Sequence, residues 1–157
     1  MIVVADTSPI NYLILIGEIN VLPALYDLVL IPPSVREELG RMRTPDAVRL
    51  WIARPPGWLE VRKPSGSGDP YLAHLDAGER DAILLAEELH ADQLIVDDNP
   101  GRQEAKRRHL PFTGTLGVLR AGAKHGLLDL KTAIGCLQQT SFHVSQDLLD
   151  QIIKSQE

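Results

Sequence analysis

The sequence predicts an α/β protein: a three-layer α/β/α sandwich around a central, mostly parallel sheet. One observation behind this prediction is that short apolar runs rich in β-branched residues alternate with longer segments of helical pattern. A second is that strands separated by helices pair in parallel, because each connection crosses over the sheet. The length of 157 residues suits one hydrophobic core. We therefore expect a single domain over 1–157, with C-terminal helices from about 127.

The first half of the chain predicts three strands and four helices. The run MIVVAD is apolar and β-branched, as in a buried strand, and Pro9 then suits a first helical turn, where its missing N–H costs nothing. Gly17 ends that helix, and Pro33 begins a later one in the same way. The expected strands are 1–6, 28–32 and 58–63. The expected helices are 9–16, 20–27, 33–43 and 46–52.

The second half continues the alternation after PSGSGDP (64–70), which has the composition of a surface loop. A helix over 78–91 leads into the fourth strand, 93–98. A basic helix over 101–109 and a short strand over 110–114 follow. Three helical stretches finish the chain, and their edges are weakened by Gly117, Gly122, Gly126 and Gly135.

Composition excludes several classes of protein. Cys136 is the only cysteine, so an intrachain disulfide and a cysteine-based metal cage are excluded, as fits a reducing cytosol. No apolar run approaches the length of a membrane span, and the N-terminus has no signal-peptide pattern, so we expect a cytoplasmic protein without membrane contact. The net charge of −5 argues against binding nucleic acid by charge alone. It does not exclude a nuclease whose acids surround divalent cations.

Two of the predicted strands end in acids. Asp6 closes the first strand, and Asp97 and Asp98 close the fourth. Because the carboxyl ends of parallel strands meet at one edge of a sheet, we expect these acids at a common rim. A structural alternative is that Asp6, Thr7 or Ser8 caps the following helix. The two adjacent aspartates diverge, so one of them could enter a site while the other caps a helix.

One predicted helix carries an acid beside its apolar stripe. Val35, Leu39 and Met42 share one face at helical spacing. Glu38 flanks this stripe, whereas Glu37 lies on the opposite, solvated face. Glu38 can therefore reach inward, although an amphipathic helix with a glutamate at its boundary explains the same pattern.

The helix over 78–91 carries two further candidates, Glu79 and Asp81. They lie near opposite margins of the apolar face, and acids in a first turn are also favoured by the helix dipole. The spacing therefore does not choose between them.

A cluster of these carboxylates requires a compensating positive charge, because neighbouring like charges raise each other's pKa values. Mg²⁺ prefers oxygen ligands and takes one or two carboxylates directly. One or two such ions can activate water and stabilise the attacking and leaving oxygens on phosphorus. The acids therefore point to phosphodiester hydrolysis with Mg²⁺ or Mn²⁺.

Five segments together resemble the PIN-domain family, and more narrowly its small prokaryotic branch related to the VapC-type toxins of toxin–antitoxin pairs. They run in family order from residue 2 to about residue 128: VVADTSPI, IPPSVREEL, LDAGERDAILLAEEL, LIVDDNPGR and FTGTLGVLRAGAKHGLL. The resemblance implies a PIN-like sandwich and a metal-dependent ribonuclease with four acids. Its products would carry a 5′-phosphate and a 3′-hydroxyl.

The resemblance also implies roles for individual residues. The catalytic acids are Asp6, Glu38, Asp81 and Asp98, and the metal ligands are Asp6, Asp81, Asp97 and Asp98. Glu38 would orient or deprotonate the attacking water, and Glu79 is the alternative to Asp81. Toxin relatives often carry T-x-D or T-x-N where this chain has VDDN, so Asp97 remains a second candidate beside Asp98. The supporting hydroxyl residues are Thr7, Ser8, Thr113 and Thr115.

RNA and protein partners follow from the same interpretation. The candidates for RNA binding lie on the basic helix after the fourth strand, and they are Arg102, Lys106, Arg107 and Arg108. Contacts of this kind position a strand without selecting its sequence, and the alternative is a solvated basic helix face. The resemblance further implies a cognate antitoxin and a homodimer.

Two other classes of function stay open. The first is a catalytically weak PIN-fold binding module that acts through protein pairing. The second is an Mg-binding receiver-like or phosphatase-like domain, although the D-x-D pair of such phosphatases is absent because Thr7 and Ser8 follow Asp6.

Overall fold

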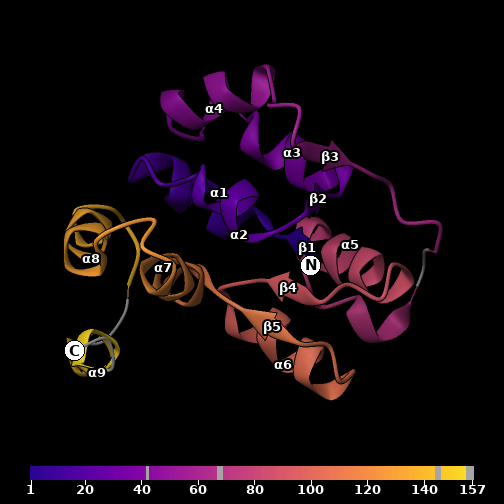
Figure 1. Cartoon of the computed structure of the whole chain (residues 1–157). Coiled ribbons are helices and arrows are strands. Elements are labelled where there is room, and N and C mark those ends of the chain that lie inside the picture. The colour runs from indigo at the N-terminus through magenta and orange to yellow at the C-terminus, as the bar shows by residue number, and fades with distance from the viewer. Residues whose placement is uncertain (42, 67–68, 144–145, 155–157) are drawn as a thin grey trace.

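A five-stranded parallel sheet forms the centre of the molecule (Figure 1). The computed structural model describes residues 1–41, 43–66, 69–143 and 146–154. Met42 of the predicted apolar stripe and residues 67–68 of the predicted loop lie outside this part of the chain. The strands are β1 (Ile2–Ala5), β2 (Leu28–Ile31), β3 (Leu59–Val61), β4 (Gln93–Ile95) and β5 (Phe112–Thr113). Their order is β3-β2-β1-β4-β5, and each neighbouring pair is parallel.

Helices connect the strands and cover both faces of the sheet (Figure 1). They are α1 (Thr7–Leu15), α2 (Val21–Leu25), α3 (Pro33–Leu39), α4 (Asp46–Ala53), α5 (Ala77–Glu88), α6 (Asn99–Arg107), α7 (Thr115–Lys124), α8 (Leu130–Gln138) and α9 (Gln146–Lys154). The predicted three-layer sandwich with a parallel sheet is thereby confirmed. Within the described residues, no helix has the length and apolar character needed to cross a lipid bilayer.

The core has two parts, one on each face of the sheet. Because successive side chains of a strand point to opposite faces, β1 contributes to both parts. Val3 and Ala5 pack with the apolar residues of α1, α2 and α7, whereas Val4 packs with those of α5 and α6. Both faces of β1 are therefore buried, which explains its continuous apolar sequence.

Some helix ends differ from the predicted ones. α1 begins at Thr7, so Pro9 occupies its third position and not its first. α3 ends at Leu39, where Gly40 follows as the C-cap, and does not continue to residue 43. β4 stops at Ile95, so the two aspartates lie in the connection to α6 and not within the strand.

The strand order reverses between β1 and β4, which is where sites form in open parallel sheets. From β1 the chain proceeds outward to β2 and β3, while β4 and β5 lie on the other side of β1. The backbone N–H of Asp6 donates to the carbonyl of Ile95 at 2.9 Å. This hydrogen bond holds the carboxyl ends of β1 and β4 together, so Asp6 lies beside the segment that follows β4.

Candidate functional site

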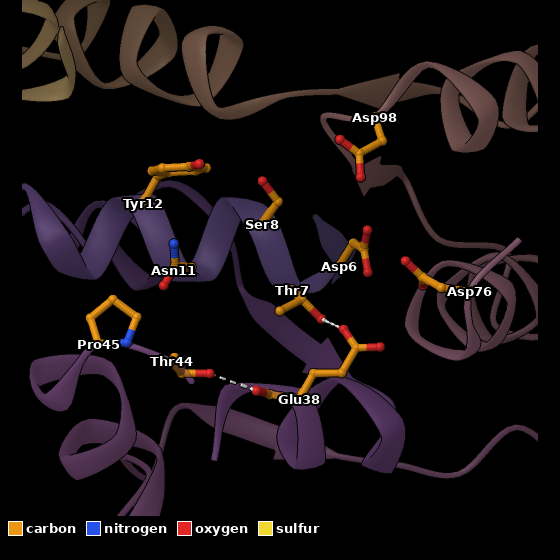
Figure 2. A pocket seen from close by; sticks show the side chains of 10 residues that line it. All are labelled: Asp6, Thr7, Ser8, Asn11, Tyr12, Glu38, Thr44, Pro45, Asp76 and Asp98. Carbon is orange, nitrogen blue, oxygen red and sulfur yellow. Dashed lines mark hydrogen bonds between the residues drawn. The ribbon is translucent and has the colours of Figure 1, made fainter. Parts of the chain in front are cut away.

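Three carboxylates from separate parts of the chain meet at this edge of the sheet. Oxygens of Asp6, Glu38 and Asp76 all lie within 4.8 Å of one another. Asp6 follows β1, Glu38 lies in α3, and Asp76 precedes α5. They line a cleft of about 360 Å³, and Figure 2 shows their carboxylates turned toward one another with Asp98 above them. We call this cavity, with Asp6, Glu38, Asp76 and Asp98 in its wall, the acidic cleft.

Asp6 is the most buried acid of the cleft, with 3% of its surface exposed. It occupies the N-cap position of α1, but its side chain makes no capping hydrogen bond. Among the described residues, Oδ1 of Asp6 has no hydrogen-bond partner. Burial raises the pKa of Asp6 to about 7, a backbone hydrogen bond from Thr7 opposes this, and the nearby carboxylates of Asp76, Glu38 and Asp98 add to it. The carboxylate is therefore not used as a helix cap.

Glu38 reaches the cleft from α3 and is oriented by a hydroxyl group. Thr7 donates its hydroxyl hydrogen to Oε2 of Glu38 (Figure 2). Thr44 donates to the backbone carbonyl of Glu38 at 2.9 Å, which anchors the end of α3. The inward position of Glu38 follows from the helical pattern, because the neighbouring Glu37 is exposed on the other face.

Asp76 and Glu79 contact each other at the start of α5. Oδ1 of Asp76 caps the helix by accepting the backbone N–H of Glu79 at 2.9 Å. Glu79 is 6% exposed, and its Oε2 has no hydrogen-bond partner among the described residues. Burial, a hydrogen bond with Asp76 and the charges of Asp76, Asp6 and Asp98 raise the pKa of Glu79 to about 8. Glu79 therefore belongs to the electrostatics of the acidic cleft, although Asp76 lines its surface.

Asp97 and Asp98 point in different directions. Asp97 accepts hydrogen bonds from the backbone N–H of Thr115 at 2.8 Å and from its hydroxyl at 2.7 Å. The hydroxyl of Ser8 donates to the same carboxylate at 3.1 Å, so Asp97 links α1 to α7. Asp98 lines the acidic cleft and makes no side-chain capping bond to α6. Burial and the charges of Asp97 and Asp76 raise the pKa of Asp98.

Asp81 lies on a different side of α5. Its Oδ2 accepts the hydroxyl of Ser34 at 2.7 Å, and its Oδ1 lies 3.5 Å from the guanidinium of Arg80. It does not line the acidic cleft. This placement differs from the role that the family resemblance implies for Asp81, because Asp76 and Glu79 are the residues of this region that interact with Asp6.

The supporting hydroxyl residues divide between two tasks. Thr7 orients Glu38, as described above, whereas Ser8 and Thr115 bind Asp97. Thr113 lies in β5, where its Oγ1 is so close to Gly117 that a methyl group at that glycine would overlap it. Thr113 does not line the acidic cleft but lines the neighbouring cavity that also contains Asp97 and Asp98.

The predicted RNA-binding residues are also placed differently from one another. Arg108 has only 11% of its side chain exposed and forms ion pairs with Glu104 at 2.8 Å, Glu87 at 2.6 Å and Asp69 at 2.6 Å. Arg107 also pairs with Glu104, and its guanidinium lies 4.9 Å from the ring centre of Tyr71. These contacts differ from the expectation that Arg108 binds RNA, because its donors are already directed at carboxylates.

Arg102 and Lys106 are not engaged in this way. Arg102 lies near the end of the sheet, with its guanidinium 5.1 Å from the ring centre of Phe112. Lys106 is exposed on α6. Within the described chain, no carboxylate lies at ion-pair distance from either of them.

The sequence interpretation missed Asp76. Asp76 and Glu79 have the spacing of a helix cap followed three residues later by a glutamate, which marks a helix start. That signal would have placed the first turn of α5 at Ala77 and drawn attention to an acid just before it.

The acidic cleft fits a hard divalent cation. Its donor set consists of carboxylate oxygens, which are the ligands that Mg²⁺ and Mn²⁺ prefer. The buried Oδ1 of Asp6 has no partner within the described residues, and a cation would provide one. The raised pKa values of Asp6 and Glu79 show that the protein's own groups do not compensate these charges.

Comparison with known proteins supports this assignment of the fold. A family model described as a PIN domain matches residues 2–157, which is nearly the whole chain. Comparisons with the curated proteins and with the solved structures found no match. The matched segment includes every strand of the sheet and all the acids of the cleft. The chain belongs to the PIN-domain family.

Proposed function

We propose that the protein is a divalent-metal-dependent ribonuclease that hydrolyses RNA phosphodiester bonds. PIN domains are generally nucleases. The observation that carries the proposal is that Asp6, Glu38 and Asp76 bring oxygens within 4.8 Å of one another although they come from distant segments. Like charges at this distance repel one another unless a cation lies between them. A divalent cation held by such carboxylates can catalyse reactions at a phosphate group.

The residues that would hold Mg²⁺ or Mn²⁺ are Asp6, Asp76 and Asp98, with Glu79 behind them. The ion would supply positive charge that neutralises phosphate oxygens and lowers the pKa of water. Thr7 holds Oε2 of Glu38, so Oε1 is the oxygen that accepts a proton from the attacking water. Attack at phosphorus then breaks the bond to the 3′-oxygen, which takes up a proton and leaves as a hydroxyl, and the 5′-phosphate remains on the other fragment.

The proposal extends to a biological setting. The resemblance of the five sequence segments to VapC-type proteins supports a role as the toxin of a toxin–antitoxin pair in the cytoplasm. A cognate antitoxin would then cover the acidic cleft or the surface beside it, and the protein would act as a homodimer. Size-exclusion chromatography with light scattering tests the dimer, and co-expression with the product of a small adjacent reading frame tests the antitoxin.

The test of the ribonuclease is cleavage of mixed RNAs by the wild-type protein and by Asp6→Asn, with Mg²⁺, Mn²⁺ or EDTA. Glu37→Gln is the matched control, because it removes an acid next to Glu38 on the exposed face of α3. We expect the wild type and Glu37→Gln to cleave with either metal, and Asp6→Asn to be inactive. Cleavage that continues in EDTA or in Asp6→Asn would refute the proposal.

The same preparation separates the rival classes of function. A receiver-like domain would become covalently labelled by a small phosphodonor, whereas the nuclease would not. A binding module without catalysis would leave RNA intact with every metal while still binding its protein partner. Both outcomes would contradict the ribonuclease.

A further inference from the structure

A second cavity of about 580 Å³ adjoins the acidic cleft. The two share Ser8, Tyr12 and Asp98 in their walls, so they form one continuous depression along α1. In Figure 2 the side chains of Ser8 and Tyr12 rise from α1 on the side away from Glu38 and Thr44. The far wall of the second cavity comes from α7 and from residues 141–143 after α8.

The charge of the depression changes sign along its length. The acidic cleft is lined by carboxylates and by no basic residue of the described chain, whereas the second cavity is lined by Arg102, Arg120 and His143 as well as by Asp97 and Asp98, which face its end nearest the cleft. Neither arginine has a carboxylate at ion-pair distance within the described chain, and Nε of Arg120 is buried without a hydrogen-bond partner there. This contrasts with Arg107 and Arg108, whose donors are directed at Glu104. The two arginines of the cavity therefore have donors left for an anion.

The cavity also offers aromatic surface. Tyr12 and Phe142 pack edge to face, with ring centres 5.0 Å apart and ring planes at 85°. The hydroxyl of Tyr12 lies 2.8 Å from that of Ser141, which fixes the tyrosine relative to the segment after α8. Both rings are half-buried, so part of each remains available to a flat ligand. Aromatic side chains of this kind stack with the bases of single-stranded nucleic acids.

We propose that this second cavity is a nucleotide subsite, which binds the nucleotide next to the scissile phosphate of a single RNA strand. Arg102 and Arg120 contact its phosphate, and the Tyr12–Phe142 pair contacts its base. The proposal rests on the proposed function, because the acidic cleft supplies the scissile position. It places the RNA strand across α1, α7 and the first turn of α6, which carries Arg102, and not along the rest of the basic helix with Lys106, Arg107 and Arg108.

Two properties of the cavity favour an RNA strand over a protein segment. Its volume lies in the range of small-ligand sites, and it combines anion donors with aromatic surface, as nucleotides require. The overall charge of −5 also disfavours capture of RNA by general attraction, so local donors beside the cleft are needed to hold a phosphate. An acidic peptide would use the arginines but not the aromatic pair.

The test measures binding of a short fluorescent single-stranded RNA by anisotropy, in EDTA and in the Asp6→Asn background, so that no cleavage occurs. Dissociation constants are recorded over a series of KCl concentrations for Arg102→Gln, Arg120→Gln and the control Lys63→Gln. Lys63 is exposed after β3, at the opposite edge of the sheet from the cavity, and carries the same charge. We expect each arginine variant to bind more weakly and to flatten the slope of log K against log salt by roughly 0.7. The control should match the parent protein.

Two further variants separate charge from folding and from stacking. Arg120→Lys should recover most of the salt slope, which a folding defect would not allow. Phe142→Leu should weaken binding on the order of tenfold with an unchanged slope, because stacking and not charge is removed.

Each outcome bears on one proposal. If both arginine variants keep the slope of Lys63→Gln, the subsite is refuted, and wild-type protein that still cleaves RNA with Mg²⁺ leaves the ribonuclease intact. If the arginine variants lose slope while wild type cleaves nothing with any metal, the subsite stands and the ribonuclease fails. Tight binding of an acidic peptide that displaces the RNA but ignores Phe142→Leu would assign the cavity to a protein partner and overturn the proposal.

Discussion

Gly78 lies directly against the carboxylate of Glu38. A methyl group on Gly78 would be 3.0 Å from both carboxylate oxygens of Glu38 and 3.2 Å from Oδ1 of Asp6. The first turn of α5 therefore packs against the acidic cleft through a residue that has no side chain. This close approach allows acids from β1, α3 and the start of α5 to share one cleft.

The first prediction concerns Gly78→Ala. Alanine favours the helix by up to about 1 kcal/mol over glycine, but its methyl group would push the carboxylates of Glu38 and Asp6 from their positions. We expect Mg²⁺ or Mn²⁺ affinity to fall roughly 10–100-fold, as for residues that orient metal ligands, while thermal stability is kept. Calorimetric titration with the metal measures this.

The matched control is Gly135→Ala in α8, where no atom of the described residues outside the helix's own backbone lies within 4 Å of the added methyl group. It should show the gain in helix stability without a change in metal affinity. Equal affinities for the two variants would show that the space at Gly78 does not matter for the cation.

The second prediction distinguishes the acids of α5. Asp76→Asn keeps a good helix cap but loses a carboxylate of the cleft, so we expect metal affinity to fall at least roughly tenfold. Glu79→Gln should also weaken metal binding, because its charge contributes to the same cluster. Asp81→Asn should bind the metal nearly as the wild type does, since it faces Ser34. If Asp81→Asn lost metal affinity while Asp76→Asn kept it, Asp81 and not Asp76 would be the metal ligand.

The third prediction is the pH dependence of stability without metal. The folded-state pKa values of Asp6 and Glu79, about 7 and about 8, lie above the ordinary values of 3.8 and 4.5. The folded state therefore holds protons that the unfolded state has released. We expect the free energy of unfolding to decrease between about pH 5 and pH 8 by several kcal/mol, because each pH unit over which one of these groups keeps its proton costs about 1.4 kcal/mol. Urea denaturation in EDTA at several pH values measures it.

Acids whose pKa values are lowered in the folded state do not change the predicted dependence of stability on pH between about pH 5 and pH 8. The guanidinium groups of Arg107 and Arg108 lower the pKa of Glu104 to about 2, so its contribution is lost only in more acidic solution. Asp6→Asn should flatten the decrease above pH 5. Added Mg²⁺ should stabilise the protein more at pH 8 than at pH 6, because protons compete with the cation. A flat profile in the wild type would contradict the prediction.

The fourth prediction concerns Arg108, which joins α6 to Glu87 of α5 and to Asp69. Arg108→Met leaves three carboxylates without their shared cation, so we expect a loss of about 3–5 kcal/mol in the free energy of unfolding. Lys106→Met removes an exposed charge from the same helix and should change stability by less than about 0.5 kcal/mol. Urea denaturation compares the two, and equal values would show that the buried ion pairs contribute little.

Much of the fold could be predicted from local pattern. The strands are short, apolar and buried on both faces, so their positions follow from composition, and the parallel sheet follows from the helices between them. The inward position of Glu38 follows from the helical period in the same way. That the whole chain forms one domain stays a prediction.

Other features depend on contacts between distant segments. A helical wheel that begins at Gly78 does not include Asp76, so the acid that lines the cleft lay outside the pattern considered. The basic residues of α6 and its end look equivalent in sequence, but they differ in the structure. Arg108 forms ion pairs with Asp69 and Glu87, whereas Arg102 has no acid of the described chain at ion-pair distance. Arg120 reaches the second cavity because α7 packs beside α1, and Phe142 reaches it because the segment after α8 packs on Tyr12.

Asp97 and Asp98 are consecutive residues with different roles: one connects helices and the other lines the acidic cleft. Asp97 clasps α1 to α7 through Ser8 and Thr115, whereas Asp98 carries no structural hydrogen bond as a helix cap. Under the proposed function, Asp98→Asn would therefore leave the scaffold intact while abolishing RNA cleavage. Immobilised on a resin, such a variant would serve as bait for recovering uncut transcripts from cell extracts.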